Sequence, residues 1–429
     1  MITTNIGKIF LKAYNEKYDK DYSARDFFDE ILYPLVFDGT KYLQWVQNSP
    51  FVQMKGKQKV ENLTKEERLK KLAEFHAKVE EGYTDASVAL GYAASEEKEF
   101  ATTSGQVTNM KLVISHEDIY LSWIGACLGL GVKGGFYILF TESSLLLDVF
   151  EGWKYYRCVV DTNEMLKGNQ LVSAWNAQWL AHRYSKHYRS NKELANFDPF
   201  TTKDGEMGIE PISWTRLLIS ICQNFTRVQM MGYVYSLGKT NTTIGFIPFF
   251  LYQIRRPYEF YQKLFAMADE AEELWGTAFG FGRACQQGCI GVRAMEPRGL
   301  KDYIEGKKMP KYKNDRLQNV LFNTYLSWLI AMLNNEELWV KAQNFAEVLQ
   351  QYSADESKGK TGKSRKVEEV MKASYKKAFM EALVEIVKEV KDTSAITEIA
   401  SLVNKMPTDN VPYFLTLVKF HYAKINNTK

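Results

Sequence analysis

The sequence predicts an α+β protein, with a mixed α/β N-terminal region that contains β-hairpins and a C-terminal helical bundle. Between residues 82 and 250, glycines are frequent and β-branched or aromatic runs recur, which is typical of strands separated by turns. From about residue 316 onward, apolar residues recur at helical spacing instead. The chain has 429 residues, 45% of them hydrophobic and 25% charged, so it can bury a core without disulfides or a structural metal.

Residues 1–81 predict a helical segment that packs on the region after it. We expect a helix over residues 6–37, with Pro34 breaking or kinking the run. Thr64 and Glu67 have the spacing of a capping box, in which each side chain binds the backbone N–H of the other residue at a helix N-terminus. This pattern predicts another helix over residues 64–81.

Residues 82–297 predict the mixed α/β region. A hairpin is expected around the polar turn at residues 238–241, because Gly and Asn tolerate the positive φ angles of tight turns. The motif Gly129-x-Gly131-x-x-Gly134 leads into an expected strand rather than a helix, so it predicts tight packing instead of dinucleotide binding. The expected strands are residues 111–115, 136–140, 157–160 and 231–237, and the expected helices are residues 171–187, 212–223 and 257–276.

Residues 298–316 predict a basic linker, and residues 317–429 predict the helical bundle. The linker holds seven basic and three acidic residues, a net charge of +4. Residues 357–366 are rich in Lys, Gly and Ser, and we expect a mobile loop there. The expected helices of the bundle are residues 317–333, 336–352, 367–390, 393–406 and 411–425.

The cysteines and the N-terminal residues predict a cytoplasmic protein. Five cysteines, an odd number in a long chain, favour a reducing compartment over a disulfide framework. The first residues lack the apolar stretch of a signal peptide, and no segment has the length and apolarity of a membrane span. We therefore expect no membrane partner.

No catalytic or cofactor motif in the sequence is decisive, and we expect no cofactor. The patterns His-Glu-x-x-His, Gly-x-Ser-x-Gly and Cys-x-x-Cys are absent. Cys285 and Cys289 have a spacing that suits half of a zinc site, but the other cysteines are isolated, so a packed thiol pair is expected. Asp148, Glu151 and Lys154 are the residue types of a restriction-type nuclease, in which acids hold Mg²⁺ and a lysine assists the water. The spacing of these three residues differs from that of the catalytic core of such nucleases, so a metal-dependent nuclease is kept only as an alternative.

Basic side chains gather in several segments, although the overall net charge is only +4. Residues 181–189 interleave cations with Tyr and His, a mixture that suits phosphate contact and base stacking. Residues 358–377 have a net charge of +6, and segregated charge of this kind favours nucleic-acid binding. The nucleic-acid contacts expected in the basic segments are Arg183, Lys186, Arg189, Arg255, Arg256, Lys307, Lys308, Lys311 and Lys313.

Two polar turns add candidates for contacts inside a groove of duplex DNA. Lys239, Thr240 and Asn241 form the tip of the expected hairpin, and a two-stranded ribbon can enter such a groove. Gln106 and Asn109 lie in a second polar turn, directly before the expected strand at residues 111–115. These five side chains are the candidates for base selectivity.

With these turns, a mixed α/β region followed by a helical bundle resembles the large subunit of type I CRISPR effector complexes (Cascade-like). The matching parts are residues 1 to about 300 and residues from about 316 to 429. The resemblance implies a role in antiviral defence, RNA-guided binding of target DNA, and other protein subunits and a guide RNA as partners. It also implies that the two polar turns correspond to groove-reading loops. The chain departs from some branches of the family, because it lacks their paired Cys-x-x-Cys zinc elements.

The sequence thus predicts a non-catalytic, nucleic-acid-binding subunit of a larger complex. Lysine and arginine contacts with phosphates would supply the affinity, and the polar turns would add modest base selectivity. Two alternatives remain open, the metal-dependent nuclease and a protein-interaction scaffold with no nucleic-acid role.

Overall fold

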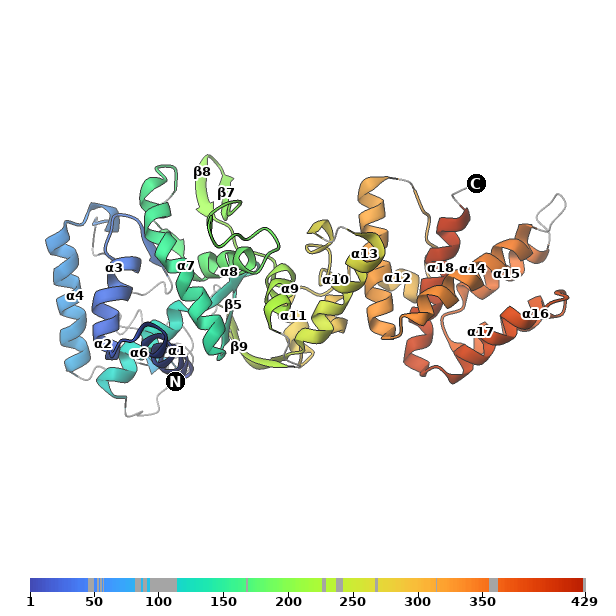
Figure 1. The fold of residues 1–429 in the computed structure, drawn as a ribbon, viewed down its shortest axis with the longest axis horizontal. Coiled ribbons are helices and arrows are strands. Elements are labelled where there is room, and N and C mark those ends of the chain that lie inside the picture. The colour runs from blue at the N-terminus through green and yellow to red at the C-terminus, as the bar shows by residue number, and fades with distance from the viewer. Residues whose placement is uncertain are drawn as a thin grey trace. The chain divides into compact units, whose positions relative to one another are not determined.

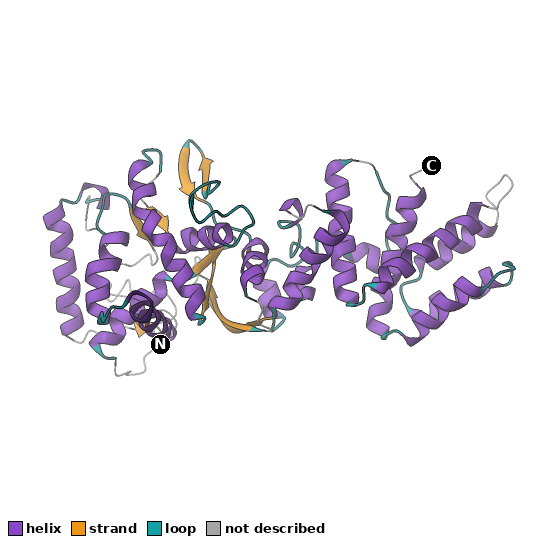
Figure 2. Ribbon diagram, viewed as in Figure 1, coloured by secondary structure: helices purple, strands orange, loops and turns teal. Residues whose placement is uncertain are grey.

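The computed structural model contains two compact units, Met1–Phe249 and Phe250–Lys429 (Figure 1). Helices dominate and a small antiparallel sheet lies in the first unit, so the chain is α+β as predicted (Figure 2). The boundary between the units falls at Phe249, whereas the sequence placed the change at residues 298–316. The described residues are 1–44, 50–51, 54, 56, 58–81, 86–87, 91–92, 114–166, 169–225, 229–236, 242–266, 269–313, 315–354 and 362–426.

The expected helix over residues 6–37 is interrupted earlier than predicted. Helix α1 ends at Tyr18, and Asp19 after it adopts a left-handed conformation. Pro34 is the second residue of α3, which continues directly from the π-helical turn at Phe28–Leu32. The capping box of Thr64 and Glu67 is confirmed and begins α4. The helices of this part are α1 (Ile2–Tyr18), α2 (Ala24–Phe27), a π-helical turn (Phe28–Leu32), α3 (Tyr33–Val36), a 3-10 turn (Val60–Asn62), α4 (Lys65–Glu80) and α6 (His116–Cys127).

Helices α1 and α6 cross at two glycines with their backbones in direct contact. A Cβ atom on Gly125 would lie 1.9 Å from the carbonyl oxygen of Thr3, and a Cβ atom on Gly7 would lie 1.9 Å from that of Leu121. The buried hydroxyls of Thr3 and Ser122 form a 2.8 Å hydrogen bond inside the same crossing. Only glycine fits these two positions at the observed spacing.

The sheet of the first unit has the strand order β10-β9-β5-β4, and all neighbours are antiparallel. Its strands are β4 (Leu130–Val132), β5 (Phe136–Phe140), β9 (Met230–Ser236) and β10 (Thr242–Phe249). The hairpin of β9 and β10 is confirmed, and so is the strand after the glycine motif, where Gly134 takes a positive φ in the turn between β4 and β5. The short pairs are β1 (Tyr42–Gln44) with β6 (Asn169–Leu171), β2 (Ala86–Ser87) with β3 (Gly91–Tyr92), and β7 (Phe200–Lys203) with β8 (Glu206–Ile209).

Helices α7 (Ser143–Thr162), α8 (Val172–Arg183) and α9 (Trp214–Asn224) complete the first unit. The expected strand at residues 157–160 is wrong, because this segment is the last part of α7. Val149, Trp153, Tyr156 and Val160 are all buried, and their spacing places them on one face of a helix. Of the strand expected at residues 111–115, residues 111–113 lie outside the described residues. Ser115, at its end, is the N-cap of α6.

The regular elements of the second unit are all helices among its described residues. Helix α18 packs against α13 and α14, and α10 packs against α13. No helix among the described residues of either unit is long and apolar enough to cross a membrane. The helices are α10 (Leu251–Phe265), α11 (Phe281–Gln286), α12 (Lys301–Ile304), α13 (Arg316–Leu333), α14 (Glu337–Ala354), α15 (Gly362–Lys372), α16 (Lys376–Val387), α17 (Ser394–Lys405) and α18 (Val411–Asn426), with 3-10 turns at Asp269–Ala271, Val292–Met295 and Thr408–Asn410.

Three predicted elements of this unit differ from the structure. The single helix expected at residues 367–390 is two helices, because Tyr375 is extended and lets α15 and α16 each bury an apolar face of its own. Residues 362–366 of the expected loop belong to α15, and residues 355–361 lie outside the described residues. The helix expected at residues 257–276 is α10, which ends where Ala266 takes a positive φ.

Candidate nucleic-acid interface

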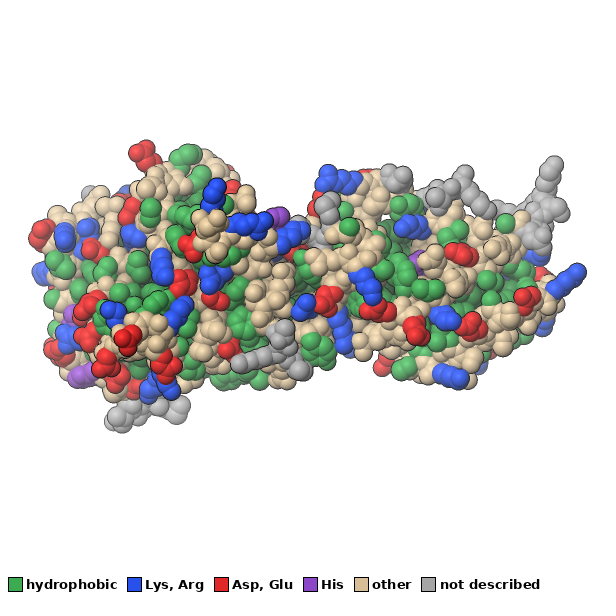
Figure 3. All heavy atoms as spheres, in the orientation of Figure 1, with side chains coloured by type: hydrophobic (Ala, Val, Ile, Leu, Met, Phe, Trp, Pro, Cys, Tyr) green, Lys and Arg blue, Asp and Glu red, His purple; other side chains and the backbone are tan. Residues whose placement is uncertain are grey.

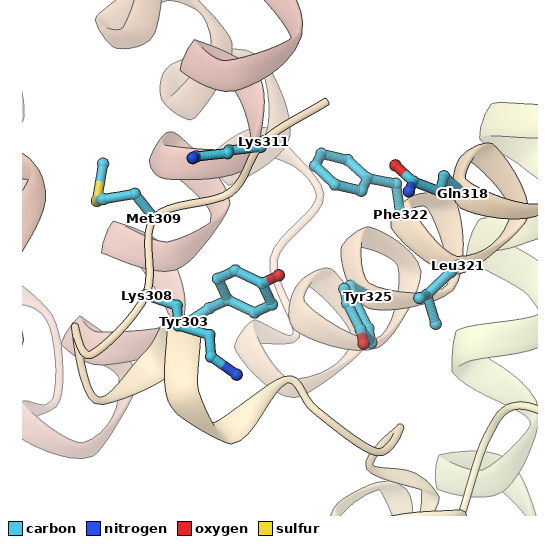
Figure 4. Close-up of a pocket in the computed structure, with 8 residues that line it drawn as sticks. All are labelled: Tyr303, Lys308, Met309, Lys311, Gln318, Leu321, Phe322 and Tyr325. Atoms are coloured by element: carbon cyan, nitrogen blue, oxygen red, sulfur yellow. The ribbon is translucent and has the colours of Figure 1, made fainter. Parts of the chain in front are cut away.

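A groove of about 480 Å³ opens on the second unit, between α13 and the segment that contains α12 and the residues after it (Figure 4). Aromatic and basic side chains meet there. One side of the groove is formed by the segment that the sequence predicted to be a basic linker, and the other side by the helix that follows it. We call it the aromatic groove. Its principal lining residues are Tyr303, Lys308, Lys311, Gln318, Phe322 and Tyr325.

The rings of the aromatic groove are fixed by packing behind them. Figure 4 shows Tyr303, Phe322 and Tyr325 arranged around one space. The ring of Phe420, on α18, lies behind them with centroid distances of 5.3, 4.6 and 5.7 Å, respectively. The hydroxyl of Tyr325 donates to the carbonyl oxygen of Arg298 at 2.8 Å, and burial raises the pKa of Tyr325 to about 12. The groove is therefore formed before any ligand enters it.

Part of the predicted positive charge at the groove is paired within the same segment. Lys308 Nζ lies 2.6 Å from a carboxylate oxygen of Asp302, and Lys307 Nζ lies 2.6 Å from one of Glu305. The net charge of the segment therefore overstates its positive potential. The two lysine side chains are well exposed and the two carboxylates are partly exposed, so these ion pairs contribute little stability and an incoming phosphate can replace either carboxylate.

Lys311 and Lys313 carry positive charges without an ion-pair partner among the described residues. Both side chains are exposed. Neither forms an ion pair with any residue that the structure describes. Lys311 lines the aromatic groove, and Lys313 follows it two residues later on the same segment. These two lysines are the strongest candidates for phosphate contact among the predicted residues.

A buried lysine adds charge behind the groove. Lys419 on α18 is 1% exposed, and its Nζ donates to the carbonyl oxygen of Tyr303 at 3.3 Å. Burial lowers the pKa of Lys419 to about 8, so the ammonium form still dominates at pH 7. A charged group held in the core next to a groove residue raises the positive potential of the groove itself.

Arg183, a predicted contact in the first unit, is held by structural bonds. Its guanidinium donates to Asp148 through Nε at 2.9 Å and Nη2 at 2.8 Å, and its Nη1 donates to the hydroxyl of Tyr188 at 3.2 Å. The hydroxyl of Tyr184 donates to the other oxygen of Asp148 at 2.5 Å. This cluster joins α7 to the end of α8, and phosphate binding would have to break it.

The other predicted arginines are also engaged. Arg189 donates to the backbone oxygens of Lys186 and Tyr188, both at 3.0 Å. In the second unit, Nε of Arg255 lies 2.7 Å from a carboxylate oxygen of Glu259. The guanidinium carbon of Arg256 lies 5.1 Å from the centroid of the Tyr252 ring. On the face drawn in Figure 3, basic and acidic side chains are interspersed. The predicted segregation of charge is not visible on that face.

The sequence singled out two polar turns as groove-reading loops. Gln106 and Asn109, and the hairpin tip of Lys239, Thr240 and Asn241, lie outside the described residues. Their roles as groove-reading loops remain predictions from the sequence. The strands that carry the second turn are described, and they form the predicted hairpin.

The residues of the alternative nuclease site lie on one helix, α7, rather than at the end of a strand. Glu151 accepts hydrogen bonds from Lys154, Tyr18 and Lys17. Burial raises the pKa of Glu151, but these three bonds outweigh it and hold the pKa at about 2. Asp148 is bound to Arg183, and Glu151 is bound to partners of its own, so both carboxylates contribute to the packing around α7. The nuclease alternative stays a prediction from the sequence.

We expect Asp148→Ala to lower the stability of the first unit by about 2 kcal/mol, because it leaves the half-buried Arg183 and the buried Tyr184 hydroxyl without their acceptor. Hydrogen exchange in α7 and α8 measures this loss. Glu164→Ala, at an exposed turn, is the control and should change nothing. Unchanged exchange, together with loss of a Mg²⁺-dependent cleavage activity, would support the nuclease alternative.

No group of three or more His, Cys, Asp or Glu side chains comes together as a metal site in the part of the chain that the structure describes. Cys285 is buried in α11 and Cys289 is partly exposed, and both are free thiols. Comparisons with protein-family models, with curated proteins and with solved structures find no match for this chain.

Sequence reasoning missed the aromatic half of the interface. Tyr303 lies inside the predicted basic linker, and its ring was a signal that the linker combines cations with stacking surfaces. Phe322 and Tyr325 follow helical spacing and look like ordinary core residues of α13. Lys419 is surrounded by apolar residues in the sequence of α18, and this position on an otherwise apolar face was the second signal.

Proposed function

We propose that the second unit binds single-stranded nucleic acid in the aromatic groove. The observation that supports this proposal is that three aromatic rings and two lysines line the same cavity. Bases stack on aromatic faces with little regard to sequence, while ammonium groups bind phosphates, so this combination suits an unpaired strand better than a duplex. The volume of about 480 Å³ lies within the usual range for ligand pockets, about 300–1,000 Å³.

Each part of the groove has a role in this proposal. A base stacks on the partly exposed ring of Tyr303, which the buried rings of Phe322 and Tyr325 support, and the amide of Gln318 is available to its polar edge. Lys308 and Lys311 contact the neighbouring phosphates, with Lys308 leaving Asp302 to do so. The ammonium of Lys419 attracts the anionic strand without touching it. The proposal is for binding without catalysis, as the sequence predicts.

The wider prediction concerns a larger assembly. Membership of a CRISPR effector complex, with target DNA, a guide RNA and other subunits as partners, rests on the resemblance described from the sequence and remains a prediction. The proposal for the aromatic groove does not depend on it, because the argument uses only the rings and lysines of the second unit.

We expect the double substitution Lys311→Glu and Lys313→Glu to weaken binding of single-stranded DNA or RNA about tenfold or more near 0.1 M salt. Each lost phosphate contact on a single strand should also reduce the slope of log affinity against log salt by about 0.7. Fluorescence anisotropy with a labelled oligonucleotide, measured across a salt series, gives both quantities.

Two further variants make this experiment specific. Lys391→Glu with Lys405→Glu has the same change in net charge at exposed positions outside the groove, and should retain most of the affinity. Tyr303→Leu removes a stacking face but no charge, so it should weaken binding without changing the salt slope. Equal losses in the groove pair and the control pair, or full affinity in Tyr303→Leu, would contradict binding in the aromatic groove.

A further inference from the structure

Acidic side chains beside the aromatic groove hold lysines of the same segment. Asp302, on α12, lies 2.6 Å from Nζ of Lys308, which lines the groove. Glu305, directly after α12, lies 2.6 Å from Nζ of Lys307. Lys311 lines the same groove and has no ion-pair partner among the described residues. The groove therefore has one lysine that is open to a ligand and one that a carboxylate of the same chain already occupies.

The backbone places Lys308 next to Asp302. The N–H groups of Lys307 and Lys308 both donate to the carbonyl oxygen of Asp302, at 2.9 and 3.1 Å. Gly306 supplies the positive φ of this turn, and a Cβ atom there would lie 2.8 Å from the carbonyl oxygen of Lys372, at the end of α15. Because backbone contacts fix the turn, the carboxylate of Asp302 stays within reach of Lys308 whether or not the two side chains are in contact.

A carboxylate at this position competes with a phosphate. Both are anionic oxygen acceptors for the same ammonium group. The hydrogen bond from Lys308 lowers the pKa of Asp302, so the carboxylate is charged at neutral pH. The pair is exposed to solvent, so a ligand can displace it, but attachment to the chain gives the carboxylate an effective concentration on the order of millimolar. A phosphate that arrives from dilute solution does not match that concentration.

We propose that Asp302 is an autoinhibitory residue of the aromatic groove, which occupies Lys308 until a bound strand displaces it. This inference rests on the proposed binding of single-stranded nucleic acid. A strand that is stacked on Tyr303 and bound to Lys311 brings its next phosphate close to Lys308, and only then competes with the attached carboxylate on comparable terms. Contact with Lys308 therefore follows binding elsewhere in the groove and adds little net affinity.

The salt dependence of binding gives a specific signature of this exchange. A phosphate contact with an open lysine releases counterions and adds about 0.7 to the slope of log affinity against log salt for a single strand. At Lys308 the phosphate replaces another anion, and the freed carboxylate attracts a cation in turn, so this contact should add almost nothing to the slope.

The test is Asp302→Asn in the full chain, measured by fluorescence anisotropy with a labelled single-stranded oligonucleotide across a salt series. Asparagine keeps the shape of the side chain and the backbone bonds of the turn, but removes the competing charge. The salt slope should become steeper by about 0.7. The affinity near 0.1 M salt should rise about two- to fivefold, the range expected for an exposed ion pair. A folding defect would not produce a gain in affinity.

Two further variants assign the gain to the pair of Asp302 and Lys308. Adding Lys308→Gln to Asp302→Asn should return the slope to that of the unmodified chain. Glu385→Gln removes the acid of another exposed ion pair, with Lys388, outside the lining of the groove, and should change neither affinity nor slope. An unchanged slope and affinity in Asp302→Asn, the same gain in Glu385→Gln, or a steeper slope that persists without Lys308 would each overturn the inference.

Failure of the proposed function has a different result. In that case Lys311→Glu with Lys313→Glu binds the oligonucleotide as tightly as its control pair does. If only the inference about Asp302 is wrong, the groove pair still weakens binding, while Asp302→Asn behaves as the unmodified chain does.

Discussion

We expect Gly125→Ala to destabilise the first unit by more than about 3 kcal/mol. The added Cβ atom would lie 1.9 Å from the carbonyl oxygen of Thr3 and 2.7 Å from the backbone nitrogen of Gly7. Both contacts are with backbone, so no side chain can rotate away and α1 must separate from α6. The separation would also weaken the buried hydrogen bond between Thr3 and Ser122.

Hydrogen exchange measured by mass spectrometry distinguishes this effect from a general loss of stability. Exchange should accelerate in peptides from α1 and α6, while peptides from the second unit should keep their protection. Gly129→Ala is the matched control, since a Cβ atom there would meet its nearest neighbours at 3.5 Å, an ordinary contact distance. Similar acceleration in both variants would show that the close helix crossing is not what determines the effect.

We expect Lys419→Met to stabilise the second unit by about 2 kcal/mol at pH 7. A pKa that falls from 10.5 to about 8 corresponds to about 3 kcal/mol of unfavourable free energy for the buried ammonium. The substitution also removes the hydrogen bond to the carbonyl oxygen of Tyr303, but that oxygen still accepts from the backbone N–H of Gly306 at 3.2 Å. Methionine has a similar length and no charge, so it fills the same space.

The dependence on pH identifies Lys419 as the cause. Because its pKa is lower in the folded chain than in the unfolded chain, the unfolded state binds more protons between pH 8 and 10.5. Stability of the second unit should therefore rise with pH across that window in the unmodified chain, relative to Lys419→Met. Exposed Lys391→Met serves as the control. Parallel pH profiles for the unmodified chain and Lys419→Met would show that the buried ammonium carries no such cost.

Local patterns in the sequence were sufficient for several elements of the fold. The capping box of Thr64 and Glu67, the hairpin of β9 and β10, and the helix at Arg316–Leu333 depend on residues near one another in the chain. The strand prediction for residues 157–160 was wrong because a short β-branched run looks the same in a strand and in the end of a buried helix. The boundary at Phe249 depends on contacts between distant segments, which a composition shift does not report.

The candidate site was harder to predict than the fold. Lys311 and Lys313 were found from charge alone, but charge could not show that Lys307 and Lys308 are paired with Glu305 and Asp302. Tertiary packing creates the aromatic groove, because Phe420 fixes rings that lie about a hundred residues earlier in the chain. No motif joins those positions.

Phe420 sets a practical limit on how substitutions in the second unit are interpreted. Its ring backs the aromatic groove through Phe322 and Tyr325. It also forms part of the wall of a second, smaller cavity of the second unit, which Trp339 and His421 line as well. A substitution that changes the size of the Phe420 side chain alters both cavities at once. Its effect on binding therefore cannot be assigned to one cavity alone. Tyr303 lines the aromatic groove and His421 lines the smaller cavity, so substitutions at these two positions distinguish the two effects.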